Sequence, residues 1–237
     1  MVTEDFAKWA SGFSGCDGGN PRGGIWLCGI EYGGGGDSEG DLNFSEDVSK
    51  PRSEARAVGD FCRFQYNSKA LKLLCALSGR DVRAYRSFYE DRRCFSSESD
   101  YLKLNLYPIG FRDTSARWED WLARKTGILT KAEYTQWCET QRFPQLRKWS
   151  QQYRPRLIIC TGKSHRSAFF RAFCGFSEPH KLEDQGEKPF WYIQTNSGHT
   201  LVAVVYFLGG RHGLNSDPKL ADTGQRLREL MNRMDTE

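Results

Sequence analysis

Short apolar runs divide this chain into strand-length segments separated by longer stretches of mixed polarity. Four runs are rich in aliphatic residues and have the length of buried, mostly parallel strands: Ile25 to Ile30, Tyr101 to Leu106, Leu157 to Thr161 and Leu201 to Leu208. A further run, Phe190 to Thr195, leads into the last of these through Asn196-Ser197-Gly198, which is typical of a tight hairpin turn. The pattern predicts a mostly parallel sheet of about four strands with an extra hairpin strand.

The segments between these runs are compatible with helices. They cover Glu54 to Ser78, Ala116 to Lys125, Lys131 to Tyr153, Ser164 to Phe173 and Thr223 to Arg233. Thr130 and Glu133 form an N-cap pattern at the start of the third segment, and Pro144 is expected to break or kink it. Alternating strands and helices indicate the α/β class, here a doubly wound, three-layer α/β/α fold. We expect residues 1–237 to form a single domain.

Composition and cysteine spacing limit where the protein is expected in the cell and which cofactors it is expected to bind. The chain contains no apolar run of about 18 residues, the length needed to span a bilayer. Glu4, Asp5 and Lys8 interrupt the apolar stretch that a signal peptide would need near the N-terminus. We therefore expect a cytoplasmic protein without a membrane partner. The eight cysteines are scattered, with no CxxC pair and no Cys/His cluster, so we expect reduced thiols and no metal.

The net charge of +4 is mild for a nucleic-acid-binding protein, but the basic residues are clustered. They concentrate in Arg80 to Arg93, Arg142 to Arg156 and Lys163 to Arg171, often beside Tyr, Phe or Trp. Such mixtures follow phosphates and offer surfaces on which bases stack. Ordinary solvated helix faces have the same composition, so both interpretations stay open.

Ligands of an open α/β sheet bind where loops leave the carboxyl ends of the strands, so the loops after the four runs should meet at one site. The first loop contains Glu31, which suits holding a water or facing a positive charge, or merely capping a helix. The second begins at Asn105, whose amide suits the edge of a flipped base, although an Asn that only satisfies backbone would look the same.

The third and fourth loops are rich in glycine. Thr161-Gly162-Lys163-Ser164-His165 joins a strand to a helix start whose free amides can bind a phosphate. It ends like a P-loop, but Leu157 stands where that motif has its first glycine, which disfavours a nucleotide-binding enzyme. In the fourth loop, Gly209-Gly210-Arg211-His212-Gly213-Leu214, the histidine could stabilise an anionic leaving group while an apolar neighbour enters the base stack, or it could be an ordinary loop residue.

Taken in order, these motifs resemble the uracil-DNA glycosylase superfamily over residues 25 to 217. Gly29-Ile30-Glu31 is similar to the family's glycine, variable residue and acidic water-positioning residue, and Phe44-Ser45 to its base-stacking phenylalanine followed by serine. The remaining correspondences, in chain order, are Pro51 with Ser53, Asn105, Gly162 with Ser164, and His212 onward. The resemblance implies a monofunctional DNA glycosylase that flips a nucleotide and needs no cofactor.

The resemblance also implies a role for each candidate residue. Glu31 and His212 would be catalytic, and the flipped base would meet Tyr32, Gly33, Phe44 and Asn105. DNA would be held by Ser53, Gly162, Lys163, Ser164, Arg211 and Gly213, with Leu214 or Arg211 as the wedge that fills the hole in the duplex. DNA is then the expected partner of a monomeric protein.

Three departures from the family pattern affect substrate choice. Tyr32 replaces the family's proline, and Gly33 stands where uracil-specific members have a tyrosine against the C5 side of the base. We therefore expect tolerance of C5 substituents, such as the hydroxymethyl or glucosylated pyrimidines of phage DNA, and a role in antiviral defence of a prokaryotic cell. The other departures are Gly213-Leu214 in place of Pro-Ser after the histidine, and Glu31 in place of Asp or Asn.

Three other functions stay open. The chain could be a uracil or thymine repair glycosylase with the same chemistry on unmodified DNA. It could also bind modified DNA without cleaving it. A small-molecule or nucleotide enzyme on a generic α/β fold is the remaining alternative, and it predicts no dependence on DNA.

Overall fold

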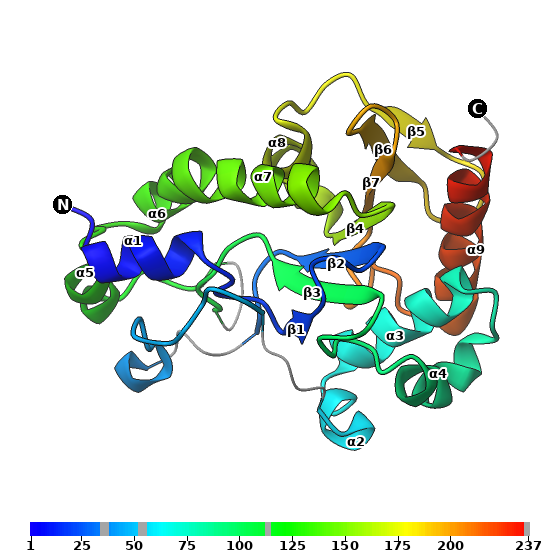
Figure 1. Cartoon of the computed structure of the whole chain (residues 1–237), viewed down its shortest axis with the longest axis horizontal. Helices are drawn as coiled ribbons and strands as arrows, with labels where there is room; N and C mark the ends of the chain where they lie inside the picture. Colours follow the sequence, from blue (N-terminus) through cyan, green and yellow to red (C-terminus); the bar gives the residue numbers. More distant parts are fainter. Residues whose placement is uncertain (34–37, 52–55, 112–114, 235–237) are drawn as a thin grey trace.

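The computed structural model describes residues 1–33, 38–51, 56–111 and 115–234. Within these ranges, one seven-stranded sheet has the strand order β1-β3-β2-β4-β7-β6-β5 (Figure 1). The strands are β1 Gly18–Gly19, β2 Ile25–Gly29, β3 Tyr101–Asn105, β4 Leu157–Thr161, β5 Lys181–Glu183, β6 Phe190–Thr195 and β7 Thr200–Val205. The α-helices are α1 Glu4–Ser11, α2 Val58–Phe61, α3 Gln65–Leu77, α4 Tyr85–Asp91, α5 Asp120–Thr126, α6 Lys131–Trp137, α7 Phe143–Tyr153, α8 Arg166–Cys174 and α9 Asp217–Met234.

The α/β class is confirmed, but the sheet is mixed and has more strands than predicted. β2 pairs in parallel with β3 and β4, and β4 pairs in parallel with β7. β1, β6 and β5 pair antiparallel with their neighbours. The additional edge strands are short, and β1 consists of two glycines, so neither carries an apolar pattern that the sequence could reveal.

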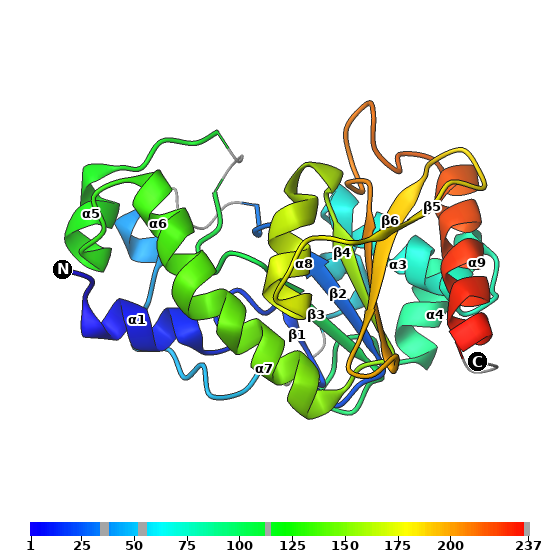
Figure 2. The same ribbon diagram turned by 90° about the horizontal axis from the view of Figure 1, so that it is seen from above.

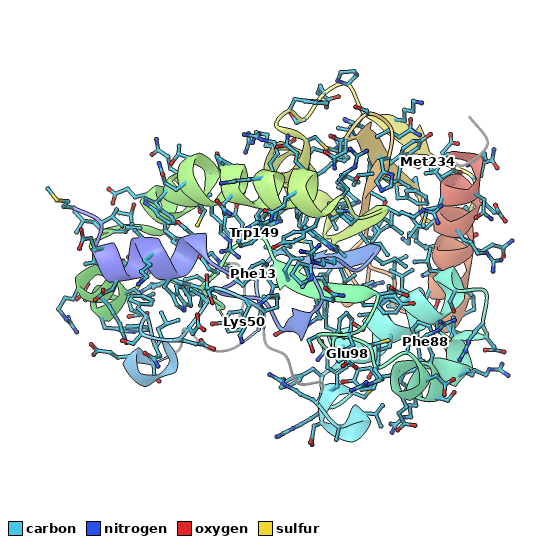
Figure 3. The ribbon with its side chains drawn as sticks, in the orientation of Figure 1. Phe13, Lys50, Phe88, Glu98, Trp149 and Met234 are labelled. Atoms are coloured by element: carbon cyan, nitrogen blue, oxygen red, sulfur yellow. The ribbon has the colours of Figure 1, made fainter. Side chains whose placement is uncertain are left out.

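Helices cover both faces of the sheet (Figure 2). Alternate strand residues point to opposite faces: Trp26 belongs to one hydrophobic core, with side chains from α1, α7 and α8, and Leu27 to the other, with side chains from α3, α4 and α9. Phe13, just after α1, stacks on Trp149 of α7 with ring centroids 4.0 Å apart (Figure 3). No helix in the described ranges is long and apolar enough to cross a membrane.

The predicted helix from Lys131 to Tyr153 does not end at Pro144. Thr130 caps α6 as expected, because its side chain accepts the N–H of Glu133 at 3.1 Å. A π-helical turn, η3 (Cys138–Arg142), then leads directly into α7, whose first turn contains Pro144. The N–H of Phe143 donates to the Cys138 carbonyl in the i to i−5 pattern of the π-helix, so Pro144, which has no N–H, lies where the hydrogen bonding changes from the π-helical to the α-helical pattern.

Candidate active site

A cleft of about 1050 Å³ lies where β2, β3, β4 and β7 end. Its walls come from the loops that follow these strands, from the segment before β1 and from the start of α3. Segments distant in sequence meet there because parallel strands direct their carboxyl ends to one edge of the sheet. The predicted site residues that line it are Glu31, Tyr32, Gly33, Asn105, Gly162, Lys163, Ser164, Arg211, His212 and Gly213.

Phe44 does not belong to this lining, so its predicted place in the pocket is wrong. Its ring packs on Phe6 and Trp9, with ring centroids 5.5 and 5.0 Å apart, and these contacts hold it behind the wall. Trp9, from α1, lines the cleft instead. Ser53, the predicted phosphate contact, lies outside the described residues.

Leu214, one of the two residues that the sequence offers as the wedge, is buried in this structure. Its side chain is 0% exposed and belongs to the hydrophobic core that α9 covers, so it is unavailable to DNA. The Leu214 N–H donates to the Phe207 carbonyl at 2.9 Å and closes the loop after β7 at its base. Arg211 and His212 are exposed in this loop, which stands out beyond the end of β7 (Figure 2).

Glu31 follows β2 in a main chain that β3 holds in place. The N–H groups of Leu106 and Tyr107 donate to the carbonyls of Gly29 and Ile30, each at 2.9 Å. These bonds extend the parallel pairing of β2 and β3 beyond their last paired residues. The half-buried Glu31 carboxylate therefore stands on a fixed backbone at the mouth of the sheet.

Asn105 is the last residue of β3 and is 4% exposed. Its Nδ2 donates to the carbonyl of Gly15 at 2.9 Å, which fixes the side-chain amide in the wall of the cleft. A Cβ at Gly29 would clash with Asn105 Oδ1, so only glycine at that position leaves room for the amide. Among the described residues, one N–H of the amide is thus committed to the Gly15 carbonyl, which leaves Oδ1 as an acceptor and the second N–H as a donor.

Arg142 holds the segments around Asn105 together. It is 1% exposed, at the end of the π-helical turn, and burial lowers its pKa. Its guanidinium donates to the carbonyls of Ser14 at 2.8 Å, Leu106 at 3.0 Å and Asn105 at 3.2 Å. The sequence placed Arg142 at the start of a basic cluster, with phosphate binding and a solvated helix face both open; Arg142 itself does neither, because its side chain is buried and ties segments together.

The loop after β4 begins at a glycine that the geometry requires. Gly162 has a φ of 137°, and a Cβ there would lie 2.7 Å from Ile30 Cδ1. Lys163 and Ser164 are exposed, and Ser164 Oγ lies 3.1 Å from His165 Nδ1. Burial lowers the pKa of His165, which favours a neutral ring there. The helix start that the sequence predicts after Gly162 is thus one turn of 3-10 helix, Lys163–His165, ahead of α8.

Cations and aromatic rings alternate beside the loop after β4. Lys163 Nζ lies 4.4 Å and Lys188 Nζ 4.9 Å from the centroid of the Tyr206 ring. Tyr206 stacks on Trp191, and Arg166 Cζ lies 4.7 Å from the Trp191 centroid. We call these five residues the cation–aromatic array; Lys163 and Tyr206 also line the cleft. Sequence reasoning missed Tyr206 because the apolar run through Leu208 was interpreted as strand.

The described residues leave the space around Gly33 open. A Cβ at Gly33 would meet no heavy atom within 4 Å among the described residues outside its chain neighbours. Tyr32 packs closely on Gly110, where a Cβ would lie 2.6 Å from Tyr32 Cδ2. The tyrosine ring is thus held against the loop after β3, and the space beside Gly33 is unfilled by described side chains.

Comparisons with known proteins add no assignment to this geometry. No family model matches the chain, and no curated protein is significantly similar to it. Among the described residues, no group of three or more His, Cys, Asp or Glu could hold a metal ion. The resemblance of the ordered loops to the uracil-DNA glycosylase superfamily stays a prediction.

Proposed function

We propose that this chain is a monofunctional DNA glycosylase, with a doubly wound fold, that hydrolyses the base–sugar bond of a flipped nucleotide. The observation that carries the proposal is the convergence of Glu31, Asn105 and His212 on one cleft from three separate loops. A carboxylate for water, an amide for a base edge and an imidazole for a leaving group are the parts that this hydrolysis requires.

The reaction follows from these parts. As the bond between C1′ and the base nitrogen breaks, positive charge grows on the sugar and the bonding electron pair leaves with the base. Glu31 would hold the water and stabilise the sugar cation, and His212 would stabilise the anionic base. The water oxygen bonds to C1′, and the proton that the water loses balances the one that the free base gains. The products are an abasic site and the base.

The substrate that we propose is a pyrimidine with a C5 substituent. The space beside Gly33 supports this choice, because no described residue fills the side of the pocket that a tyrosine would close. Hydroxymethylated and glucosylated cytosines of phage DNA are substrates of this kind, which would make the protein part of antiviral defence. Unmodified uracil or thymine is the alternative substrate.

DNA as the partner is supported by the cation–aromatic array. Arg166, Lys163 and Lys188 offer positive charge for phosphates, and the rings of Trp191 and Tyr206 offer stacking surface beside the cleft. The same array favours a second candidate function, binding of modified DNA without cleavage. The two functions differ in their dependence on Glu31.

The test uses matched DNA duplexes that carry one cytosine, thymine, uracil, 5-hydroxymethylcytosine or its glucosylated form. Alkali-labile abasic sites are scored for the wild type, Glu31→Gln and His212→Ala. Glu98→Gln and His199→Ala serve as matched controls, because neither residue lines the cleft. Abasic sites that disappear only in the two cleft variants support the glycosylase; binding without abasic sites on any substrate supports the second candidate.

A further inference from the structure

An ion pair that the proposed chemistry does not use lies in the wall of the cleft. Lys103 Nζ donates to Asp17 Oδ2, and the two side chains are 7% and 24% exposed. Both residues line the cleft. Lys103 comes from the middle of β3, where its strand neighbours Leu102 and Leu104 are fully buried in the core.

A lysine in this position costs stability that an apolar residue would not. Lys103 Nζ lies 5.7 Å from the Phe61 ring centroid and 5.4 Å from that of Tyr66, so two aromatic rings lie near the ammonium. Removing two charges from water is expensive, and apolar residues of similar volume often replace a buried pair without loss of stability. Retaining the pair beside a cleft therefore points to a use in binding.

The pair lies next to Asn105. Lys103 and Asn105 occupy alternate positions of β3 and so point to the same face of the sheet. The Asp17 N–H donates to the Lys103 carbonyl at 2.9 Å, and Gly15, two residues before Asp17, accepts the Asn105 amide. The chain from Gly15 to Asp17 thus joins the amide and the ion pair in one stretch of wall.

We propose that Asp17 and Lys103 form a subsite for a hydroxyl-bearing substituent on the base, such as a hexose. This inference rests on the proposed function, in which Asn105 reads the Watson–Crick edge of the base. The C5 atom is bonded to the C4 atom of that edge, so a C5 substituent leaves the ring beside the group that Asn105 reads. Gly33 and the ion pair line the same cleft, so a substituent that leaves the ring on the Gly33 side would have to extend along the wall to reach the pair.

The charges of the pair favour hydroxyl groups over an anion. Asp17 neutralises Lys103, so the pair offers one acceptor group and one donor group side by side with little net charge. A sugar hydroxyl both donates and accepts, and it matches this arrangement. An anionic ligand would be repelled by Asp17. The aromatic ring of Tyr66, which also lines the cleft, adds an apolar surface for the sugar face.

The size of the cleft agrees with a substrate larger than one base. Pockets for drug-sized ligands measure about 300–1,000 Å³. The cleft, at about 1050 Å³, therefore has room for a nucleotide and a hexose together. The sequence separation of 86 positions between Asp17 and Lys103 explains why no local motif indicates this subsite.

The test compares two DNAs that differ only in glucosylation of one 5-hydroxymethylcytosine. Dissociation constants and single-turnover cleavage rates are measured for the wild type, Asp17→Asn and Lys103→Met. The control variants are Lys72→Met and Asp217→Asn, since Lys72 and Asp217 form a pair at 2.7 Å with Lys72 over the Tyr85 ring and lie outside the cleft lining. Urea denaturation of each variant establishes that it is folded.

We expect the wild type to bind the glucosylated DNA about tenfold more tightly than the hydroxymethylated DNA. A hydrogen bond to a charged group provides a free energy of this size. Asp17→Asn and Lys103→Met should remove that preference, whereas the control variants should keep it. If the variants lose affinity equally for both DNAs, the pair has a purely structural role and the proposal is overturned. A wild type that binds both DNAs equally would also overturn it.

The binding measurement separates this subsite from the proposed glycosylase. Cleavage of hydroxymethylated DNA without any preference for glucosylated DNA would reject the subsite and retain the glycosylase. A preference in binding that depends on Asp17, without cleavage of either DNA, would retain the subsite and reject the glycosylase.

Discussion

The main-chain N–H of Leu214 donates to the carbonyl of Phe207 at 2.9 Å, and this bond closes the loop that presents His212. The closure is tight, because a Cβ at Gly213 would clash with the carbonyl oxygens of Gly209 and Phe207. Leu214 anchors the loop in the core. Its burial argues against a role as the wedge, but it holds the base of the loop that carries His212.

The Gly213→Ala variant should therefore lose catalysis while staying folded. The methyl group forces the loop open and displaces His212, and we expect the single-turnover rate to fall about a hundredfold, the lower range of a lost general acid–base or electrostatic group. The control is Gly59→Ala, an exposed position whose Cβ meets open space. An unchanged rate in Gly213→Ala would mean that the loop geometry is irrelevant to the reaction.

Replacing Gly33 by tyrosine should narrow the substrate range. The new ring would enter the open space and close the side of the pocket that we assign to C5. Cleavage of DNA with a C5-substituted base should drop by about a hundredfold, as expected for a clash of a few kcal/mol, while any cleavage of uracil persists. Rates on paired substrates provide the measurement, with Gly59→Tyr as control. Equal loss on both substrates would contradict an open C5 side.

The cation–aromatic array predicts a specific salt dependence of DNA binding. Lys163→Ala and Lys188→Ala should each reduce the slope of log K against log salt concentration by about 1, because each removes one phosphate contact. Lys181→Ala is the matched control, since Lys181 lies over Tyr192 on β6 and not in the array. Slopes identical to that of the wild type would remove the array from the DNA path.

The buried thiols predict a loss of stability in alkali. Burial raises the pKa of Cys16, Cys94, Cys138 and Cys174 from 9.0 to about 12. The unfolded chain releases these protons first, so the free energy of unfolding should fall as pH rises from 9 toward 12. Each thiol contributes up to about 1.4 kcal/mol per pH unit in this window. Urea denaturation between about pH 8 and pH 10 measures the slope of the free energy of unfolding against pH. The Cys138→Ala variant should have a smaller slope. A free energy of unfolding that does not change with pH would refute the prediction.

The sequence predicted the inner strands well because they are continuous aliphatic runs. The bounds of β4 and β6 agree with the prediction, and the hairpin between β6 and β7 is confirmed by their antiparallel pairing. The strand ends were less certain: the run through Leu208 was interpreted as strand, whereas β7 ends at Val205. Phe207 is 46% exposed and lines the cleft, so apolar character there reflects the site and not the core.

The sequence predicted the site residues that a single loop after a strand brings to the cleft. It did not predict the roles of residues that depend on contacts between distant segments. Glu31, Asn105 and His212 follow strand ends and could be placed in one cleft from the α/β pattern alone. From the sequence, Phe44 and Leu214 could contact a base or the DNA. Only the tertiary structure shows that their side chains are packed against other residues of the protein. Within its described residues, the predicted helix from Glu54 to Ser78 contains two helices, α2 and α3, since local pattern does not reveal the break between them.

The internal tie at Arg142 has an electrostatic consequence. An arginine keeps its positive charge inside a protein, and the partners described for this guanidinium are carbonyl and hydroxyl oxygens that do not neutralise it. Its field acts through the Asn105 peptide in a medium of low dielectric constant, where it is weakly screened. The buried charge of Arg142 therefore makes a positive contribution to the potential behind Asn105, in the wall of the cleft.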